Sequence, residues 1–118
     1  MGDVIFNVIH IPKQFRAGGK SPVSLLIESG YLEMQDNIGV EDIIKGLDLY
    51  PECMEDWQIW SEDKRSSSGW FWGKGTNNHY FVGYFPFDSS IPECIFEDKK
   101  SACGYFIEKE IGRIIMRM

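Results

Sequence analysis

The stretch SSSGWFWGKGTNNHYFVGYF, residues 66–85, decides the fold of this chain. Two parts of it, residues 70–72 and 80–85, are rich in the aromatic and β-branched side chains that favour strands. Residues 75–78 between them contain Gly and Asn, which tolerate a positive φ. The pattern therefore predicts a β-hairpin.

Neither face of this hairpin is polar. Because side chains alternate along a strand, we expect Trp70 and Trp72 on one face and Phe71 on the other. One face is expected to pack under the C-terminal helix, and part of the other is expected to remain available for a partner. On the second strand the same alternation places Tyr80, Val82 and Tyr84 opposite to Phe81 and Phe85.

The glycines of this stretch do not match the motif of a phosphate-binding loop. The spacing from Gly69 to the Gly73–Lys74 pair is one residue shorter than a Walker motif requires, and Gly75 stands where that motif needs Ser or Thr. Gly73 and Gly83 are better explained as strand glycines that let a neighbouring aromatic ring lie across the backbone.

Two further segments are predicted to be strands. Residues 3–11, DVIFNVIHI, are β-branched and carry apolar side chains on both faces, which predicts a central strand. A loop is expected over residues 12–20, and another strand over residues 93–97. With the hairpin these segments make an antiparallel or mixed sheet of about four strands in an α+β domain.

The middle and the end of the chain show helical spacing. Ser21 followed by Pro22 predicts a helix start, because Ser can accept hydrogen bonds from the first backbone N–H groups. Ser101 is expected to cap the last helix, in which close packing on the sheet would explain Gly104 and Gly112. The predicted helices, which are expected to pack on the sheet, span residues 22–29, 40–50, 51–64 and 101–115.

The length and composition are those of one folded domain. The chain has 118 residues, of which 43% are hydrophobic, and no apolar run is long enough for a membrane helix. The N-terminus lacks the basic region of a signal peptide. We therefore expect a single domain, residues 1–118, in the cytoplasm and without a membrane partner.

The charge is distributed unevenly. Residues 28–63 contain eleven acids and one base, a net charge of −10, whereas the remaining eleven bases and seven acids give +4. A negative field repels a nucleic-acid backbone and steers a cationic partner toward the protein. The segment predicts a basic protein partner and no nucleic acid, although a solvated helical surface explains most acidic proteins equally well.

The residues that could carry chemistry are scattered along the sequence. Cys53, Cys94 and Cys103 form no CxxC pair, so reduced structural thiols are expected and no metal site. His10 and His79 lie far apart, with no Ser or Cys motif beside them, which argues against a catalytic triad. We expect no catalytic residue and no cofactor.

One enzymatic alternative remains. Glu52, followed by Glu62 and Lys64, echoes the acid plus ExK arrangement of metal-dependent nucleases, in which carboxylates hold magnesium beside a lysine. Both acids fall on or beside a predicted helix rather than on adjacent strands. The acidic surroundings would also repel DNA.

The string WQIWSEDKRSSSGWFW, residues 57–72, is similar to a pattern found in small bacterial immunity proteins of contact-dependent and polymorphic toxin systems. A stretch similar to ACGYFIEKEI, residues 102–111, accompanies it in such chains. The resemblance implies a single-domain protein that binds and neutralises one cognate toxin, in many cases a basic nuclease. The residues that carry the resemblance are Trp57, Trp60, Ser61, Asp63, Lys64, Arg65, Ser68, Gly69 and Trp70.

The predicted toxin-binding surface combines acids with aromatic anchors. The acids would set the association rate, and the anchors would set the residence time. Two alternatives remain open: an α+β binding domain with another role, and a solvated ion network formed by Asp63, Lys64 and Arg65. The predicted acids are Glu41, Asp42, Asp48, Glu52, Glu55, Asp56, Glu62 and Asp63, and the predicted anchors are Trp60, Trp72 and Tyr84.

Overall fold

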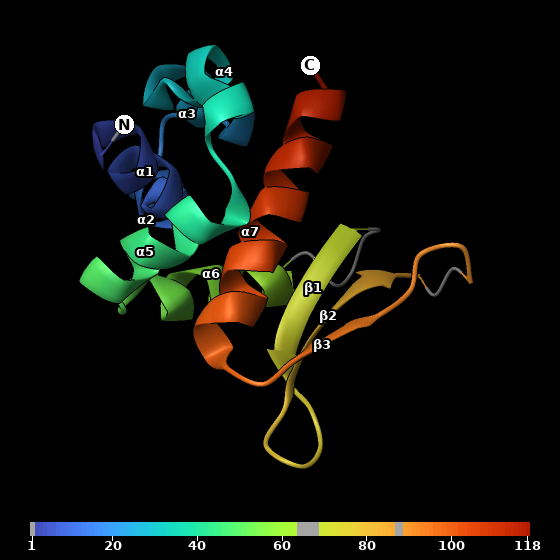
Figure 1. Ribbon diagram of the computed structural model, residues 1–118. Helices are drawn as coiled ribbons and strands as arrows, with labels where there is room; N and C mark the ends of the chain where they lie inside the picture. The colour runs from blue at the N-terminus through green and yellow to red at the C-terminus, as the bar shows by residue number, and fades with distance from the viewer. Residues whose placement is uncertain (1, 64–68, 87–88) are drawn as a thin grey trace.

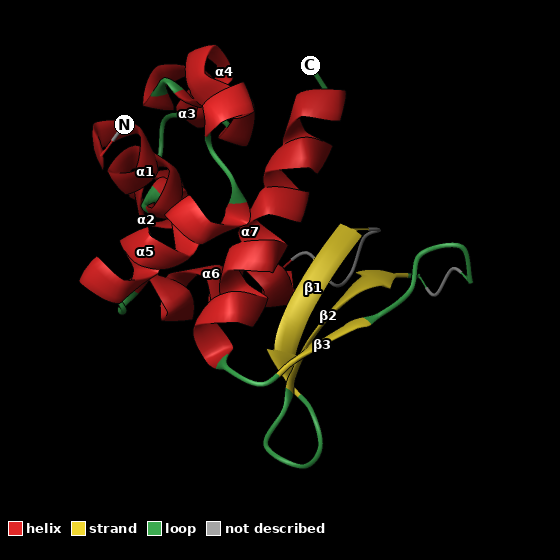
Figure 2. Cartoon of the chain, viewed as in Figure 1, coloured by secondary structure: helices red, strands yellow, loops and turns green. Residues whose placement is uncertain are grey.

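α7 (Lys99–Met116) lies between a helical layer on one side and a three-stranded sheet on the other (Figure 1). The computed structural model describes residues 2–63, 69–86 and 89–118. Within them, helices and strands form one α+β domain, and the two kinds of element occupy separate regions (Figure 2). The α+β class expected from the sequence is confirmed.

The sheet is antiparallel, with the order β1-β2-β3. The predicted hairpin is confirmed: Trp70 pairs with Tyr84, and Trp72 pairs with Val82. In the turn, Asn77 and Asn78 have φ values of 55° and 61°. The described residues contain three strands rather than about four: β1 (Gly69–Lys74), β2 (Tyr80–Phe85) and β3 (Cys94–Phe96).

The N-terminal segment is helical as far as Ala17, so the predicted central strand at residues 3–11 is wrong, and the predicted loop at residues 12–20 is confirmed only for residues 18–20. α1 (Gly2–Ile9) and α2 (Ile11–Ala17) occupy this region instead. Apolar residues at positions 5, 8, 9 and 12 follow the helical period, and they are buried together with Ile11. Burial of that stripe outweighs the strand preference of β-branched side chains, and Pro12 is accommodated because it lies in the first turn of α2.

The helices predicted after residue 20 are present with small shifts at their ends, whereas the helical segments at residues 31–37 were not predicted. Ser21 caps the first of them by accepting a hydrogen bond from the Ser24 N–H, and Gly30 closes it in the left-handed conformation. α7 begins two residues before Ser101, and its cap is Asp98. No helix in the described part of the chain combines the length and apolar character needed to cross a bilayer. These middle elements are α3 (Pro22–Ser29), α4 (Tyr31–Met34), the 3₁₀ turn η1 (Gln35–Asn37), α5 (Val40–Leu49) and α6 (Cys53–Asp63).

An aromatic core joins the helices to the sheet. Trp57 of α6 and Trp72 of β1 lie with ring centroids 6.1 Å and 6.4 Å from Phe106 of α7. α6 also holds the edge of β1, because the Trp72 N–H donates to Ser61 Oγ at 3.1 Å and Gln58 Nε2 donates to the Trp72 carbonyl at 3.0 Å. These contacts fix the position of α6, which carries most of the predicted site.

Glycines permit two kinds of close approach in this core. In the hairpin, a Cβ on Gly83 would lie 3.1 Å from the ring of Phe71, which confirms that an aromatic ring crosses this strand. In α7, a Cβ on Gly104 would lie 2.6 Å from Ile44 Cγ1. Gly104 therefore packs against α5 and not against the sheet, while Gly112 faces open space.

Candidate protein-binding site

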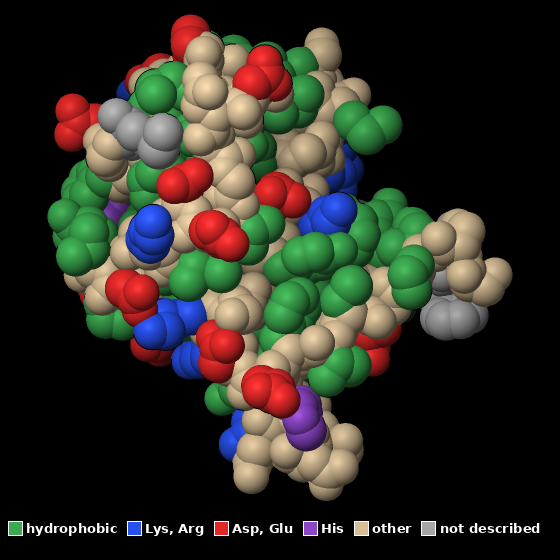
Figure 3. All heavy atoms as spheres, viewed as in Figure 1, with side chains coloured by type: hydrophobic (Ala, Val, Ile, Leu, Met, Phe, Trp, Pro, Cys, Tyr) green, Lys and Arg blue, Asp and Glu red, His purple; other side chains and the backbone are tan. Residues whose placement is uncertain are grey.

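The predicted acids are less concentrated in space than they are in the sequence. Three ion pairs connect the acidic segment to bases outside it: Asp56 pairs with Arg16 at 2.6 Å, Glu28 pairs with Lys20, and Asp48 pairs with Lys100. Asp42 accepts a hydrogen bond from the Gly39 N–H and caps α5. Figure 3 shows acidic and basic side chains interspersed over the helical part of the molecule.

Four of the predicted acids are exposed and have no ion pair within the described residues: Glu41, Glu52, Glu55 and Glu62. Three of them belong to α6 or directly precede it. Glu55, Ile59 and Glu62 follow the i, i+4, i+7 spacing and therefore share one side of the helix. We call this side, with Glu52 and Asp56, the acidic face of α6. The side chain of Asp63 lies outside the described residues, as do Lys64 and Arg65.

An apolar pocket opens beside this face, and we call it the α6 pocket. It encloses about 290 Å³ and is lined by Pro12 and Phe15 of α2, Pro22 of α3, and Ile59 and Trp60 of α6. Phe15 is 43% exposed and Ile59 is 40% exposed, so both present apolar surface to solvent. The Arg16–Asp56 ion pair forms the polar part of the lining.

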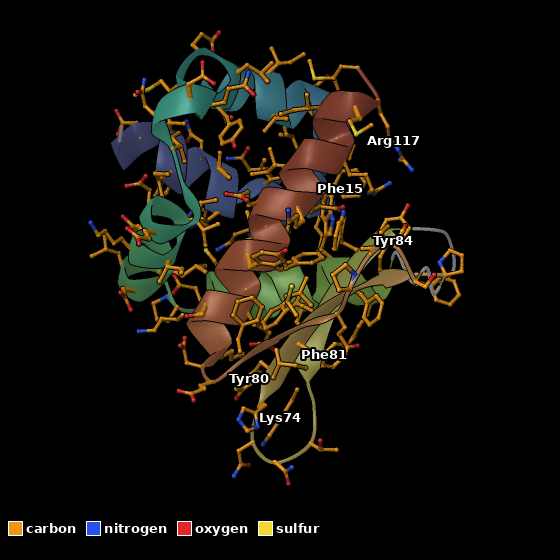
Figure 4. The ribbon with its side chains drawn as sticks, turned by 45° about the vertical axis from the view of Figure 1, so that its right-hand side comes forward. Phe15, Lys74, Tyr80, Phe81, Tyr84 and Arg117 are labelled. Carbon is orange, nitrogen blue, oxygen red and sulfur yellow. The ribbon has the colours of Figure 1, made fainter. Side chains whose placement is uncertain are left out.

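The three predicted aromatic anchors lie in different places. Trp72 is buried in the core and presents no surface to a partner. Trp60 is also buried, but it lines the α6 pocket and contacts Phe15 edge to face at 5.3 Å. Tyr84 is half-buried on the hairpin and pairs with Trp70, and Figure 4 shows it at the end of β2 remote from Lys74. Among the predicted anchors, only Trp60 therefore adjoins the acidic face of α6.

A buried ionic network supports the floor of the pocket. Trp60 Nε1 donates to Glu110 Oε2 at 2.5 Å, and Arg113 Nε donates to Glu110 Oε1 at 2.8 Å. Glu110 is fully buried, and the hydrogen bonds from Trp60 and Arg113 offset the cost of removing its carboxylate from water. The network joins α6 to α7 and holds Trp60 in one orientation.

The geometry does not support the nuclease alternative. Glu52 precedes the first residue of α6 and Glu62 lies near its last turn, so about ten residues of helical rise separate them by roughly 15 Å. One magnesium ion binds its ligands at about 2.1 Å and cannot bridge that separation. Lys64 lies outside the described residues.

His10 and Cys53 are remote in the sequence but adjacent in the structure. His10 Nε2 lies 3.5 Å from Cys53 Sγ, although 43 positions separate them. Burial raises the pKa of the Cys53 thiol to about 11, and the Glu52 and Asp56 carboxylates act in the same direction. A thiol held in its neutral form is a poor nucleophile, so this pair does not form an activated cysteine.

Several pocket residues carried no signal in the sequence. Pro12 and Phe15 fall in the segment expected to be a loop, and Pro22 reads as a helix start. The contact of Phe15 in α2 with Trp60 in α6 joins segments that are remote in the sequence, and no sequence pattern indicated it. Searches of protein-family models, curated proteins and solved structures each found no match to this chain.

Proposed function

We propose that this protein is a bacterial immunity protein that binds and neutralises a cognate toxin through the α6 pocket and the acidic face of α6. The observation that carries the proposal is the exposed apolar pair, Phe15 and Ile59, bordered by the exposed acids Glu55 and Glu62. Protein interfaces commonly combine an apolar centre with a polar rim. Here the apolar centre is shared by α2 and α6, and the acids lie on α6.

The charge of this surface favours a basic toxin. Nucleases fit this description, because proteins that bind nucleic acid carry Lys and Arg to neutralise phosphates. Acids on the immunity protein would then steer the encounter and occupy the substrate-binding charges of the toxin. The pocket would receive an apolar or aromatic side chain of the toxin and set the residence time.

The proposal is tested with the product of the coding sequence directly upstream, since immunity genes adjoin their toxin genes. That product is expressed from an inducible promoter in a bacterial host, with and without this protein. We expect growth arrest by the upstream product alone and restored growth when both are present. Arrest that persists at equal expression, with no complex on size-exclusion chromatography, would contradict the proposal.

A surface variant connects the outcome to the pocket. Ile59→Asp places a charge in the pocket while changing an exposed position, so the fold should be retained. Leu49→Asp is the matched control, because Leu49 is 76% exposed on α5, outside the pocket. We expect Ile59→Asp to shorten the residence time of the complex at least about tenfold and Leu49→Asp to leave it unchanged. Equal effects of both variants would place the contact elsewhere.

A further inference from the structure

Three potential metal ligands meet where the α1–α2 junction adjoins the start of α6. One ligand atom each from His10, Glu52 and Cys53 lies within 4.8 Å of the other two. His10 stands between α1 and α2, whereas Glu52 and Cys53 are adjacent in the sequence. The cluster therefore links segments that are remote along the chain.

The imidazole of His10 is already oriented for coordination. Its Nδ1 lies 2.7 Å from the Phe6 carbonyl oxygen and donates a proton to it, so Nε2 carries the lone pair. The ring stacks on Phe6 with centroids 4.1 Å apart and meets Tyr50 edge-on at 5.3 Å. A histidine that binds a metal typically donates its other ring N–H to a carbonyl or carboxylate, which fixes tautomer and orientation in this way.

The separation of the two inner ligand atoms suits tetrahedral zinc. Bonds of about 2.0 Å to nitrogen and about 2.3 Å to sulfur, at a tetrahedral angle, place these two atoms about 3.5 Å apart. The distance from His10 Nε2 to Cys53 Sγ is 3.5 Å. Imidazole nitrogen, thiolate sulfur and carboxylate oxygen are all zinc ligands, and this mixed set suits Zn²⁺ better than Mg²⁺ or Ca²⁺.

We propose that His10, Glu52 and Cys53 bind one Zn²⁺ ion, with a water molecule as the fourth ligand. Cys53 is buried and His10 is partly buried, whereas Glu52 is exposed and free to rotate onto the ion. The ion enters, and its water faces solvent, on the side of Glu52. The carboxylate of Asp56 adds negative charge near the thiol, and Lys13 is the opposing positive charge.

Zinc binding by Cys53 should release one proton to solvent. In the metal-free state Cys53 Sγ lies 3.5 Å from His10 Nε2, within reach of an S–H hydrogen bond to it. On binding, the S–H bond breaks, a Zn–S bond forms and the proton leaves to solvent. One proton is therefore released for each ion bound, with no change in oxidation state.

The test uses the purified, reduced protein and Co²⁺ as a spectroscopic substitute for Zn²⁺. We expect one equivalent of Co²⁺ to give a thiolate-to-cobalt charge-transfer absorption and the visible bands of tetrahedral cobalt, both removed by Zn²⁺. Cys53→Ala should abolish the charge-transfer absorption. Glu52→Gln and His10→Gln, at positions outside the fully buried core, should weaken binding at least about tenfold.

Each ligand has a matched control elsewhere on the chain: Cys94→Ala, His79→Gln and Glu55→Gln should bind Co²⁺ as the unmodified protein does. Circular dichroism of each variant shows whether it is folded, so that a loss of Co²⁺ binding can be distinguished from a loss of structure. Absence of a charge-transfer absorption in the unmodified protein, or its persistence in folded Cys53→Ala, would overturn the proposal and leave the His10–Cys53 contact as a hydrogen bond only. No toxin is present, so the result is independent of the proposed immunity function.

Discussion

Glu110 of α7 joins this helix to α6 through a buried side chain. Its buried carboxylate accepts hydrogen bonds from Trp60 Nε1 and from Arg113. Arg113 has a side chain that is only 12% exposed, so it has little access to solvent as a replacement partner. A buried ion pair is not in itself strongly stabilising. Removing one partner is strongly destabilising, because the other charge stays buried without a partner.

We predict that Glu110→Ala lowers the free energy of unfolding by about 3–5 kcal/mol, because it leaves the Arg113 charge without this carboxylate. Urea unfolding of the purified variant measures the loss. Glu108→Ala, at a half-buried position on the same helix, is the control and should cost much less. A loss for Glu110→Ala no greater than for the control would show that the network contributes little to stability.

Asp98 makes the start of α7 sensitive to acid. Its Oδ1 accepts the Ser101 N–H and its Oδ2 accepts the Ser101 hydroxyl, each at 2.8 Å. The backbone bond and then the hydroxyl bond hold the pKa of Asp98 below its ordinary value. Because the folded pKa is lower than the unfolded one, the stabilisation is complete above about pH 4 and is lost as the pH falls through the folded pKa.

Asp98→Ala should therefore lower the free energy of unfolding by about 1 kcal/mol at neutral pH, as expected for loss of a helix cap. The difference from the unmodified protein should shrink as the pH is lowered below about 4, where the carboxylate becomes protonated in both states. Urea titrations at neutral and acidic pH measure both quantities. Glu97→Ala, which removes the neighbouring exposed acid, should show neither effect, and a pH-independent difference for Asp98→Ala would contradict the prediction.

At the scale of elements, α7 contains two glycines in opposite environments. A Cβ at Gly104 would lie 2.6 Å from Ile44 Cγ1 and 3.7 Å from the Ile44 nitrogen, so α5 approaches this turn of α7 closely. A Cβ at Gly112 meets no atom within 4 Å. The same substitution should therefore have opposite effects at two positions of one helix.

We predict that Gly104→Ala destabilises the protein by about 1–3 kcal/mol through overpacking. Gly112→Ala should stabilise it by roughly 0.5–1 kcal/mol, because alanine restricts the unfolded backbone and favours the helix. Thermal and urea unfolding of the two single variants test the pair. Stabilisation by Gly104→Ala would show that α5 can shift away from this position without a loss of stability.

The elements that the sequence predicted well are those with strong local signals. The hairpin has two aromatic strands around Gly and Asn, and α3 has a Ser–Pro start and a glycine end. Residues 3–11 lacked such signals, because β-branched residues favoured a strand while positions 5, 8 and 9 followed the helical period. Burial against α5 and α3 decides that competition, and a single sequence does not contain those contacts.

Residue pairs remote in sequence were the least predictable part of the site. Placing His10 in a strand separated it from Cys53, whereas the α1–α2 junction brings their side chains within 3.5 Å. Similarly, the α6 pocket needs α2 as a wall, and α2 was expected to be a loop. The acids of α6, by contrast, were predictable from the helical spacing of residues 55, 59 and 62 alone.

At the scale of the whole molecule, charge should act on the rate of toxin binding. Glu55 and Glu62 lie on the acidic face of α6, whereas Glu33 and Asp36 are also exposed but belong to α4 and η1, outside that face. Reversing either pair to Lys changes the net charge by the same amount. The two double variants therefore separate local steering from the overall charge.

We predict that Glu55→Lys/Glu62→Lys slows association with the cognate toxin roughly tenfold at low salt and loses most of that effect at high salt. Glu33→Lys/Asp36→Lys should change the rate less than about twofold. Stopped-flow association at several ionic strengths gives both rates. Equal slowing by both pairs would mean that net charge steers the encounter and that the acidic face of α6 has no special part in it.

The clustering of indole rings gives this protein a built-in optical reporter. Trp57 and Trp60 lie with ring centroids 5.5 Å apart, and Trp72 joins them through Phe106, so three of the four tryptophans share one dry environment. Their combined emission should lie at short wavelength and shift to the red only when α6, α7 and β1 separate. Because Trp60 also lines the α6 pocket, a ligand that enters there should change the emission of the folded protein. Binding of an unlabelled partner can then be followed by the intrinsic tryptophan fluorescence of this protein.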